Sequence, residues 1–187
     1  PGDVERVAQL LAEDKTVAVC RGRMEWGPRA LCHRSILARP HDPEINDWLN
    51  KKLDRSEFMP FAPVARAEDA ERYFVGVDVA AASSQFMTIC FDTTQEFKDN
   101  CAAAVHVDGT ARPQLVTSQS APHMHALLTR LDALTGTGVL INTSFNLHEE
   151  PIVCSPSDAV RAFSAAELDA LWLGPFVAER VSSGDQS

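Results

Sequence analysis

The residues VLINTSFN, at positions 139–146, join an apolar segment to a run of polar side chains. Val139–Asn142 is mostly β-branched and aliphatic, which predicts a buried strand. Thr143, Ser144 and Asn146 follow it directly. Loops after the C-terminal ends of strands bind ligands in open α/β sheets, so we expect uncharged hydrogen-bonding groups at a ligand site here. The alternative is ordinary turn chemistry, in which these residue types serve only the backbone.

On both sides of this segment, the hydrophobic pattern alternates between helical and strand periods. Helices are predicted at residues 3–14, from Pro43 to about Leu53, from Pro122 to about Leu134, and from Pro156, after a Ser155 cap, to about Ala165. Strands are predicted at Thr16–Cys20, Phe86–Phe91, Leu168–Leu173 and Phe176–Ala178, and Ala103–Val107 and Gln114–Thr117 are predicted to flank a hairpin turn at residues 108–110. This order predicts an α/β fold with a mixed twisted sheet and flanking helices.

The size of the chain fits one domain. It has 187 residues, and no linker interrupts residues 1–180, so we expect a single domain followed by a polar tail at 181–187. Because it begins at Pro1 and shows no basic-then-apolar leader, we expect it to be part of a longer polypeptide. No apolar run approaches the ~20 residues of a membrane-spanning helix, so no membrane partner is expected.

The charge and the cysteines exclude further classes. The chain carries 17 Lys and Arg against 26 Asp and Glu, a net charge of -9, which argues against a general nucleic-acid partner. Its five cysteines are odd in number, scattered and never spaced as CxxC. This pattern favours buried, reduced thiols in a cytoplasmic protein over a disulfide framework or a zinc site.

Standard catalytic and nucleotide motifs are absent. There is no P-loop, no GxGxxG fingerprint, no GxSxG elbow and no HExxH. His123 and His125 lie two positions apart in a predicted helix, so they point to different sides. We therefore predict no metal ligands in this chain.

Positive charge is concentrated in one segment of this acidic chain. Between Thr16 and Pro40 there are five arginines and one glutamate, a local charge of +4: Arg21, Arg23, Arg29, Arg34 and Arg39 against Glu25. Guanidinium groups bind phosphate oxygens bidentately. The Gly27-Pro28 pair predicts a loop that enters a helix N-terminus at Gly27–Arg29, which would offer N–H groups to an anion. The alternative is a solvated or salt-bridged basic surface.

A second basic run contains Lys51, Lys52 and Arg55 and precedes the segment PFAP at 60–63. The two prolines fix the backbone and could form the wall of a pocket. Alternatively, the cations complement the C-terminal dipole of the preceding helix. Arg112, just after the predicted hairpin turn, could add one more cation.

Three segments together resemble the O-carbamoyltransferases of the NodU/CmcH family. They are GRMEWGPRAL at 22–31 with RSIL at 34–37, EFMPFAP at 57–63, and NTSFN at 142–146 with EPIV at 150–153. Their order and spacing match the C-terminal domain of those enzymes over about residues 1–178. The resemblance implies a YrdC-like α/β fold with a concave, positively lined cavity that binds anions. The pair Ser144 and Asn146 is also similar to the Ser-x-Asn of YrdC proteins.

The sequence departs from the usual family pattern at a few positions. Cys32-His33 stands where a glycine and a small or polar residue are common. Met59 is often Arg in other branches, and Glu149 is often Gly. The Met and Glu changes resemble the antibiotic-tailoring branch of the family.

The resemblance implies that this domain converts carbamoyl phosphate and ATP into carbamoyl adenylate. An N-terminal transfer domain outside this sequence, with an ASKHA-type fold and bound iron, would then pass the carbamoyl group to a hydroxyl of a small-molecule acceptor, as in antibiotic biosynthesis. Mg²⁺ would accompany the ATP, held mainly by the nucleotide and water. One alternative is a noncatalytic nucleotide-binding or structural module. Another is an activity like that of threonylcarbamoyl-adenylate synthases, and the GRMEWGPRAL and PFAP segments argue against this second alternative.

The same hypothesis assigns roles to individual side chains. The catalytic candidates, which would bind phosphate and carbamoyl oxygens, are Lys52, Arg55, Arg112 and Ser144. The candidates for binding the nucleotide are Arg23, Arg29, Arg34, Asn142, Ser144 and Asn146. In this assignment Ser144 and Asn146 hydrogen-bond a phosphate or the carbamoyl group, and Asn142 orients the loop.

Overall fold

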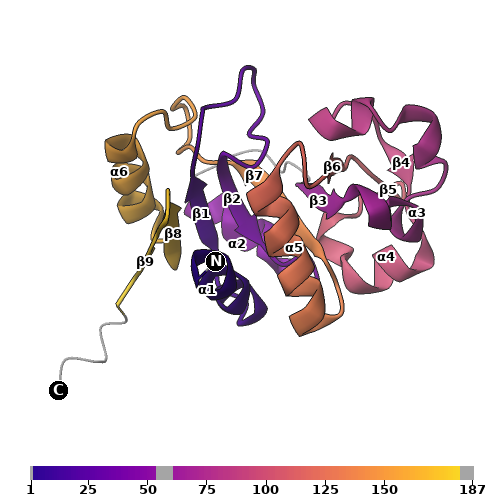
Figure 1. Cartoon of the computed structure of the whole chain (residues 1–187), viewed down its shortest axis with the longest axis horizontal. Coiled ribbons are helices and arrows are strands. Elements are labelled where there is room, and N and C mark those ends of the chain that lie inside the picture. Colours follow the sequence, from indigo (N-terminus) through magenta and orange to yellow (C-terminus); the bar gives the residue numbers. More distant parts are fainter. Residues whose placement is uncertain (1, 54–60, 182–187) are drawn as a thin grey trace.

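The computed structural model describes residues 2–53 and 61–181. Its centre is a seven-stranded mixed sheet in the order β6-β3-β7-β2-β1-β8-β9 (Figure 1). The strands are β1 Val17–Cys20, β2 Arg34–Ala38, β3 Ala62–Arg66, β6 Gln114–Val116, β7 Val139–Ser144, β8 Ala170–Leu173 and β9 Phe176–Glu179. The β1–β8 and β3–β6 pairs are parallel and the other neighbours antiparallel. The predicted mixed α/β sheet is confirmed.

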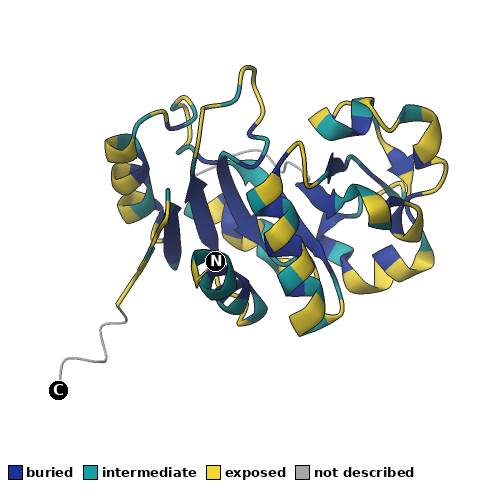
Figure 2. Cartoon of the chain, in the orientation of Figure 1, coloured by how far each residue is buried: buried dark blue, intermediate teal, exposed yellow. Residues whose placement is uncertain are grey.

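Helices cover both faces of this sheet. α1 (Gly2–Ala12) packs beside α5 (Pro122–Thr135) on one face, where Leu11 and Leu128 join Leu140 of β7 in one apolar cluster. α2 (Glu44–Lys52) and α6 (Pro156–Ala166) supply the opposite cluster, which contains Leu49 and Ile141. Successive residues of a strand point to opposite faces, so β7 contributes to both clusters. Figure 2 shows the central strands buried between the helices.

Local signals explain where the two long C-terminal helices begin and end. α5 starts at Pro122 and stops at Gly136, which adopts the left-handed conformation with φ 78°. α6 starts with a capping box, in which the Ser155 side chain accepts from the Asp158 backbone N–H and the Asp158 carboxylate accepts in return. Both helices match the sequence predictions to within about a residue.

Residues 67–111 form a smaller lobe beside the β6–β3 edge of the sheet (Figure 1). The lobe contains the helices α3 (Ala70–Tyr73) and α4 (Gln95–Asn100), the strand pair β4 (Phe91–Asp92) and β5 (Thr110–Ala111), and 3₁₀ turns at Ala67–Asp69, Val77–Ala80, Ser83–Phe86 and Ala102–Ala104. Its own aromatic core contains Tyr73, Phe74 and Phe97, and the same cluster includes Leu115 of β6. The lobe and the sheet therefore share one apolar core.

Two sequence predictions in this lobe are wrong. The expected hairpin does not form, because Ala102–Ala104 is a 3₁₀ turn and β6 pairs with β3 instead. The turn itself is present, and Gly109 has φ 82° there. The expected strand at Phe86–Phe91 is only the short β4, which pairs with β5. Both errors arise because the strand partners lie far apart in sequence.

A further correction concerns the basic segment. No helix begins at Gly27–Arg29, which lies in the connection between β1 and β2. The β2 and β3 strands were not predicted. Pro63 lies inside β3, opposite Ile141 of β7, and the pairing of β3 with β6 begins at Val64, so the missing N–H of Pro63 interrupts no hydrogen bond to β6.

No helix within residues 2–53 and 61–181 combines the length and the apolar character needed to cross a bilayer.

Candidate functional site

A cavity of about 400 Å³ lies at the strand ends of the sheet, beside the C-terminal end of β7 and the N-terminal ends of β2 and β3. The β1–β2 connection, the start of β3, the connection between β5 and β6, and the end of β7 all contribute to it. Its lining residues are Pro28, Arg29, Ala30, Phe61, Ala62, Met87, Arg112, Asn142, Thr143, Ser144 and Asn146. Five of the predicted site residues, Arg29, Arg112, Asn142, Ser144 and Asn146, therefore meet at one cavity.

Two guanidinium groups give the cavity its charge. Arg112 donates to the carbonyl oxygen of Met87 at 2.8 Å, and within residues 2–53 and 61–181 it makes no ion pair. Burial lowers the pKa of Arg112, and the neighbouring positive charge of Arg29 lowers it further. None of the described lining residues is Asp or Glu. Like charges at a hollow without a described counter-ion favour the binding of an anion.

A buried amide network lies behind one wall of the cavity, to which Asn142 and Ala30 contribute. Asn142 is 2% exposed and donates through Nδ2 to Gln114 Oε1 at 2.6 Å and to the Ala30 carbonyl at 3.3 Å. Gln114 Oε1 also accepts from the Cys32 thiol at 3.2 Å. Burial raises the pKa of Cys32, so the thiol keeps its proton. Asn142 Oδ1 is buried and has no hydrogen-bond partner in the described part of the chain.

The polar residues at the end of β7 are held by backbone contacts. Ser144 Oγ accepts from the Ala30 backbone N–H at 3.3 Å. Asn146 Nδ2 donates to the carbonyls of Leu147 and Glu150 at 2.9 and 3.1 Å. The backbone of β7 pairs with β2 up to Ser144, which places these side chains at the C-terminal end of β7. The polar residues expected in a loop after this strand thus lie at the cavity, although Thr143 and Ser144 belong to the strand itself.

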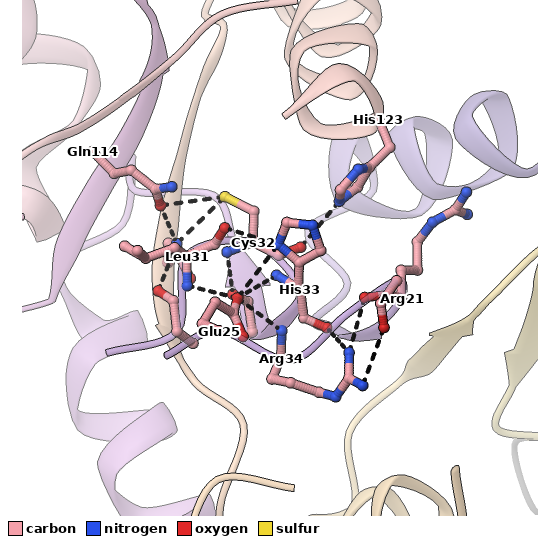
Figure 3. Close-up of polar contacts among 12 residues, drawn as sticks. Arg21, Glu25, Leu31, Cys32, His33, Arg34, Gln114 and His123 are labelled. Atoms are coloured by element: carbon pink, nitrogen blue, oxygen red, sulfur yellow. Dashed lines mark hydrogen bonds and ion pairs between the residues drawn. The ribbon is translucent and has the colours of Figure 1, made fainter. Parts of the chain in front are cut away.

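The connection between β1 and β2, which carries Arg29, is organised by a single carboxylate (Figure 3). Glu25 Oε1 accepts from the backbone N–H groups of Leu31, His33 and Arg34 at 2.8, 2.6 and 3.2 Å. Burial alone would raise the pKa of Glu25, but the contact with the His33 side chain and these N–H groups lowers it to about 2. A charged Glu25 therefore holds this connection in place.

Arg34 is one of the predicted nucleotide-binding residues, but the structure places it away from the cavity lining. It is 6% exposed, and its guanidinium donates to the carbonyls of Arg21, Gly22, His33 and Cys154 at 2.8 to 3.3 Å. Figure 3 shows the Arg34 guanidinium beside Arg21 and His33. These contacts join the start of β2 to the segment before α6. A structural role explains all the contacts recorded for the Arg34 side chain.

The other predicted cations lie elsewhere. Arg23 is exposed and lines a neighbouring hollow of about 430 Å³ together with Trp26 and Phe86. Lys52 forms an ion pair with Glu167 at 2.5 Å and is not a described lining residue. Arg55 lies outside the described residues, as does Pro60 of the proposed pocket wall. Phe61 and Ala62 of that segment do line the cavity.

Sequence reasoning missed Gln114 and Glu25 as parts of this site. A signal existed for Gln114, because a glutamine begins the strand segment that continues with Leu115 and Val116, and buried glutamine needs polar partners. Glu25 was counted in the sequence only for its charge, although a single acidic residue among arginines is a candidate to hold their segment in place. His123 and His125 belong to no metal-binding group, since residues 2–53 and 61–181 contain no cluster of three suitable side chains.

Comparison with known proteins identifies the family of this chain. A family model described as the carbamoyltransferase C-terminus matches residues 8–180. Nodulation protein NolO of Bradyrhizobium diazoefficiens is 39% identical, with the match covering 92% of this chain and 32% of that protein. A 3'-hydroxymethylcephem-O-carbamoyltransferase of Amycolatopsis lactamdurans is 38% identical over 86% of this chain and 30% of that protein. The chain spans about a third of the length of the curated relatives that it matches.

Solved structures share the fold. Full-length HypF, crystallised in a phosphate- and nucleotide-bound form, is similar with a TM-score of 0.64 and 21% identity over 96% of this chain and 26% of that chain. Sua5 of P. abyssi in complex with L-threonine gives a TM-score of 0.60 at 12% identity over 91% of this chain and 46% of that chain. The predicted YrdC-like fold is thereby confirmed.

Proposed function

Because the chain belongs to the carbamoyltransferase C-terminus family, we propose that its cavity binds carbamoyl phosphate and ATP and forms carbamoyl adenylate. The observation that carries this proposal is the pair Arg29 and Arg112 at one cavity whose described lining has no carboxylate. Carbamoyl phosphate and ATP bring several negative charges together. A site for them needs cations that are not already neutralised by the protein.

The cavity supplies the groups that this chemistry needs. Arg112 and Arg29 bind phosphate oxygens, and Ser144 and Asn146 hydrogen-bond the phosphate or the carbamoyl group. Water cleaves carbamoyl phosphate to carbamate and phosphate. A carbamate oxygen then attacks the α-phosphorus of ATP, and pyrophosphate leaves with the electrons of the broken P–O bond. Positioning and charge stabilisation dominate such a step, so no covalent contribution from the chain is required.

A metal ion and two further basic residues belong to the same proposed site. Mg²⁺ would bind as a complex with ATP, held by phosphates and water, since the described lining offers cations and amides rather than carboxylates. Lys52 and Arg55 remain candidates for the catalytic role on the family resemblance alone.

A separate N-terminal transfer domain with iron would pass the carbamoyl group to a hydroxyl acceptor, as in antibiotic biosynthesis. Five free cysteines support a reducing cytoplasm as the compartment.

The proposal is tested by incubating the purified protein with ATP, Mg²⁺ and carbamoyl phosphate. Mass spectrometry then follows pyrophosphate, AMP and carbamoyl adenylate. The expected result is adenylate that needs carbamoyl phosphate and is reduced in Arg112→Ala but not in Arg161→Ala, whose arginine pairs with Glu150 on the surface. ATP binding without product would make the domain a noncatalytic binding module. Product that forms only with threonine and bicarbonate would identify a threonylcarbamoyl-adenylate synthase.

A further inference from the structure

Two side chains on one face of the sheet meet beside the cavity. Ala62 lies opposite Asn142, and Val64 lies opposite both Leu140 of β7 and Gln114 of β6. Because side chains alternate along a strand, Gln114 and Asn142 project from the same face. Gln114 is 3% exposed and Asn142 is 2% exposed, so both amides must find their hydrogen bonds inside the protein or from a ligand.

The surrounding acceptors fix which way the Asn142 amide points. The carbonyl of Ala30 can only accept, and it lies 3.3 Å from Nδ2. Gln114 Oε1, which lies 2.6 Å from the same nitrogen, also accepts from the Cys32 thiol. Rotating the Asn142 amide would place two oxygens against each other at the Ala30 carbonyl. Nδ2 therefore faces Ala30 and Gln114, and Oδ1 is the amide atom left to take a donor.

Asn142 Oδ1 differs from the other two oxygens of this network, Gln114 Oε1 and the Ala30 carbonyl oxygen, which each accept a hydrogen bond. Asn142 lines the cavity, yet Oδ1 is shielded and has no partner among the described residues. A shielded acceptor without a donor carries a penalty that a donor from the ligand would remove. The other polar groups assigned to the cavity suit phosphate oxygens. An acceptor suits a ligand that carries N–H groups as well.

We infer that Asn142 Oδ1 accepts a hydrogen bond from the amino group of the carbamoyl moiety, and that Gln114 holds the Asn142 amide in the orientation that makes this possible. Resting on the proposed function, this makes Asn142 a specificity-determining residue and Gln114 a positioning residue. The pair selects a carbamoyl group over an acyl group of the same shape that has no N–H. Acetyl phosphate, with a methyl in place of the amino group, is such a compound.

The experiment compares the binding of carbamoyl phosphate and acetyl phosphate by calorimetry, without ATP so that no adenylate forms. The wild-type protein is expected to favour carbamoyl phosphate by about 5- to 150-fold, the range for leaving a shielded acceptor unpaired. In Asn142→Leu the preference falls to about onefold through weaker carbamoyl phosphate binding, with acetyl phosphate little changed. Gln114→Leu loses most of the preference in the same way. Gln9→Leu, at a partly buried glutamine of α1 that donates to Glu5, keeps it.

Three outcomes overturn the inference, and they are distinguishable. Equal binding of the two compounds by the wild-type protein leaves the proposed function standing and removes the role of Asn142. Failure to bind either compound removes the proposed function as well. The wild-type ratio needs no variant, so the test holds even where Asn142→Leu or Gln114→Leu does not fold. If both variants fold and retain the full preference, another group makes the selection.

Discussion

Arg29 and Arg112 come from different connections of the sheet, yet they line one cavity and the charge of Arg29 lowers the pKa of Arg112. Neither has a carboxylate partner in the part of the chain that the structure describes. Two like charges brought together without compensation destabilise the unliganded fold, and they favour whatever anion binds between them. This relationship distinguishes the pair from most of the other arginines in the chain.

Replacing Arg112 by alanine is expected to reduce adenylate formation by about 10- to 100-fold, because a hydrogen bond to a charged group contributes about 1.5–3 kcal/mol. The unfolding free energy should change by only about 1 kcal/mol, since the side chain makes a single recorded hydrogen bond, to Met87. Steady-state kinetics and urea unfolding measure the two effects. Equal losses of activity and stability would contradict a direct role in binding.

Arg29→Ala separates binding from stability in a different way. Its side chain is exposed, and removing it takes one positive charge away from Arg112. We expect weaker ATP binding together with an unchanged or slightly higher melting temperature. Raising the salt concentration should shrink both effects, because exposed charges are screened. A clear drop in melting temperature would show that Arg29 serves the fold instead.

Arg34→Met should behave in the opposite manner. The change removes the guanidinium donor of four carbonyls, although the His33 carbonyl still accepts from the Arg21 backbone N–H, and we expect the unfolding free energy to fall by about 3 kcal/mol or more. Arg39→Met is the matched control, because its arginine forms one pair with the exposed Asp14 and should cost less than about 1 kcal/mol. Urea midpoints at constant slope report the difference. Lost ATP binding with full stability would instead assign Arg34 to the ligand.

Glu25→Gln should lower stability in a pH-dependent manner. The pKa of Glu25 falls from 4.5 to about 2 in the folded protein, which corresponds to about 3 kcal/mol of stabilisation. That stabilisation is complete above pH 4.5 and disappears as the pH falls toward 2. The contact with Glu25 raises the pKa of His33, so the part due to His33 is complete below its ordinary 6.5 and is lost at higher pH.

The gap between the wild-type protein and Glu25→Gln should therefore be largest between about pH 4.5 and 6.5 and should close toward pH 2. Chemical unfolding at a series of pH values measures this profile. A gap that does not change with pH would mean that the carboxylate charge contributes nothing and that only the shape of the side chain matters.

Much of the architecture follows from local sequence. The helices at Gly2–Ala12, Pro122–Thr135 and Pro156–Ala166 have apolar spacing, prolines at the start or capping residues of their own, so each could be predicted. The strand that contains Asn142 was predicted from its apolar residues, although it continues to Ser144, two residues beyond the predicted end. The small lobe was not, because its short strands exist only through partners distant in sequence, as β4 does with β5.

The sequence by itself determined which chemical groups are available: arginines in an acidic chain, and amides and hydroxyls after a buried strand. Only the tertiary structure decided which of them act together. It buried Arg34 among carbonyls, paired Lys52 with Glu167, and left Arg29 and Arg112 at one cavity. The physical reason is that a guanidinium has the same intrinsic chemistry everywhere, whereas its role depends on the acceptors that the sheet order and its connections bring within hydrogen-bond distance.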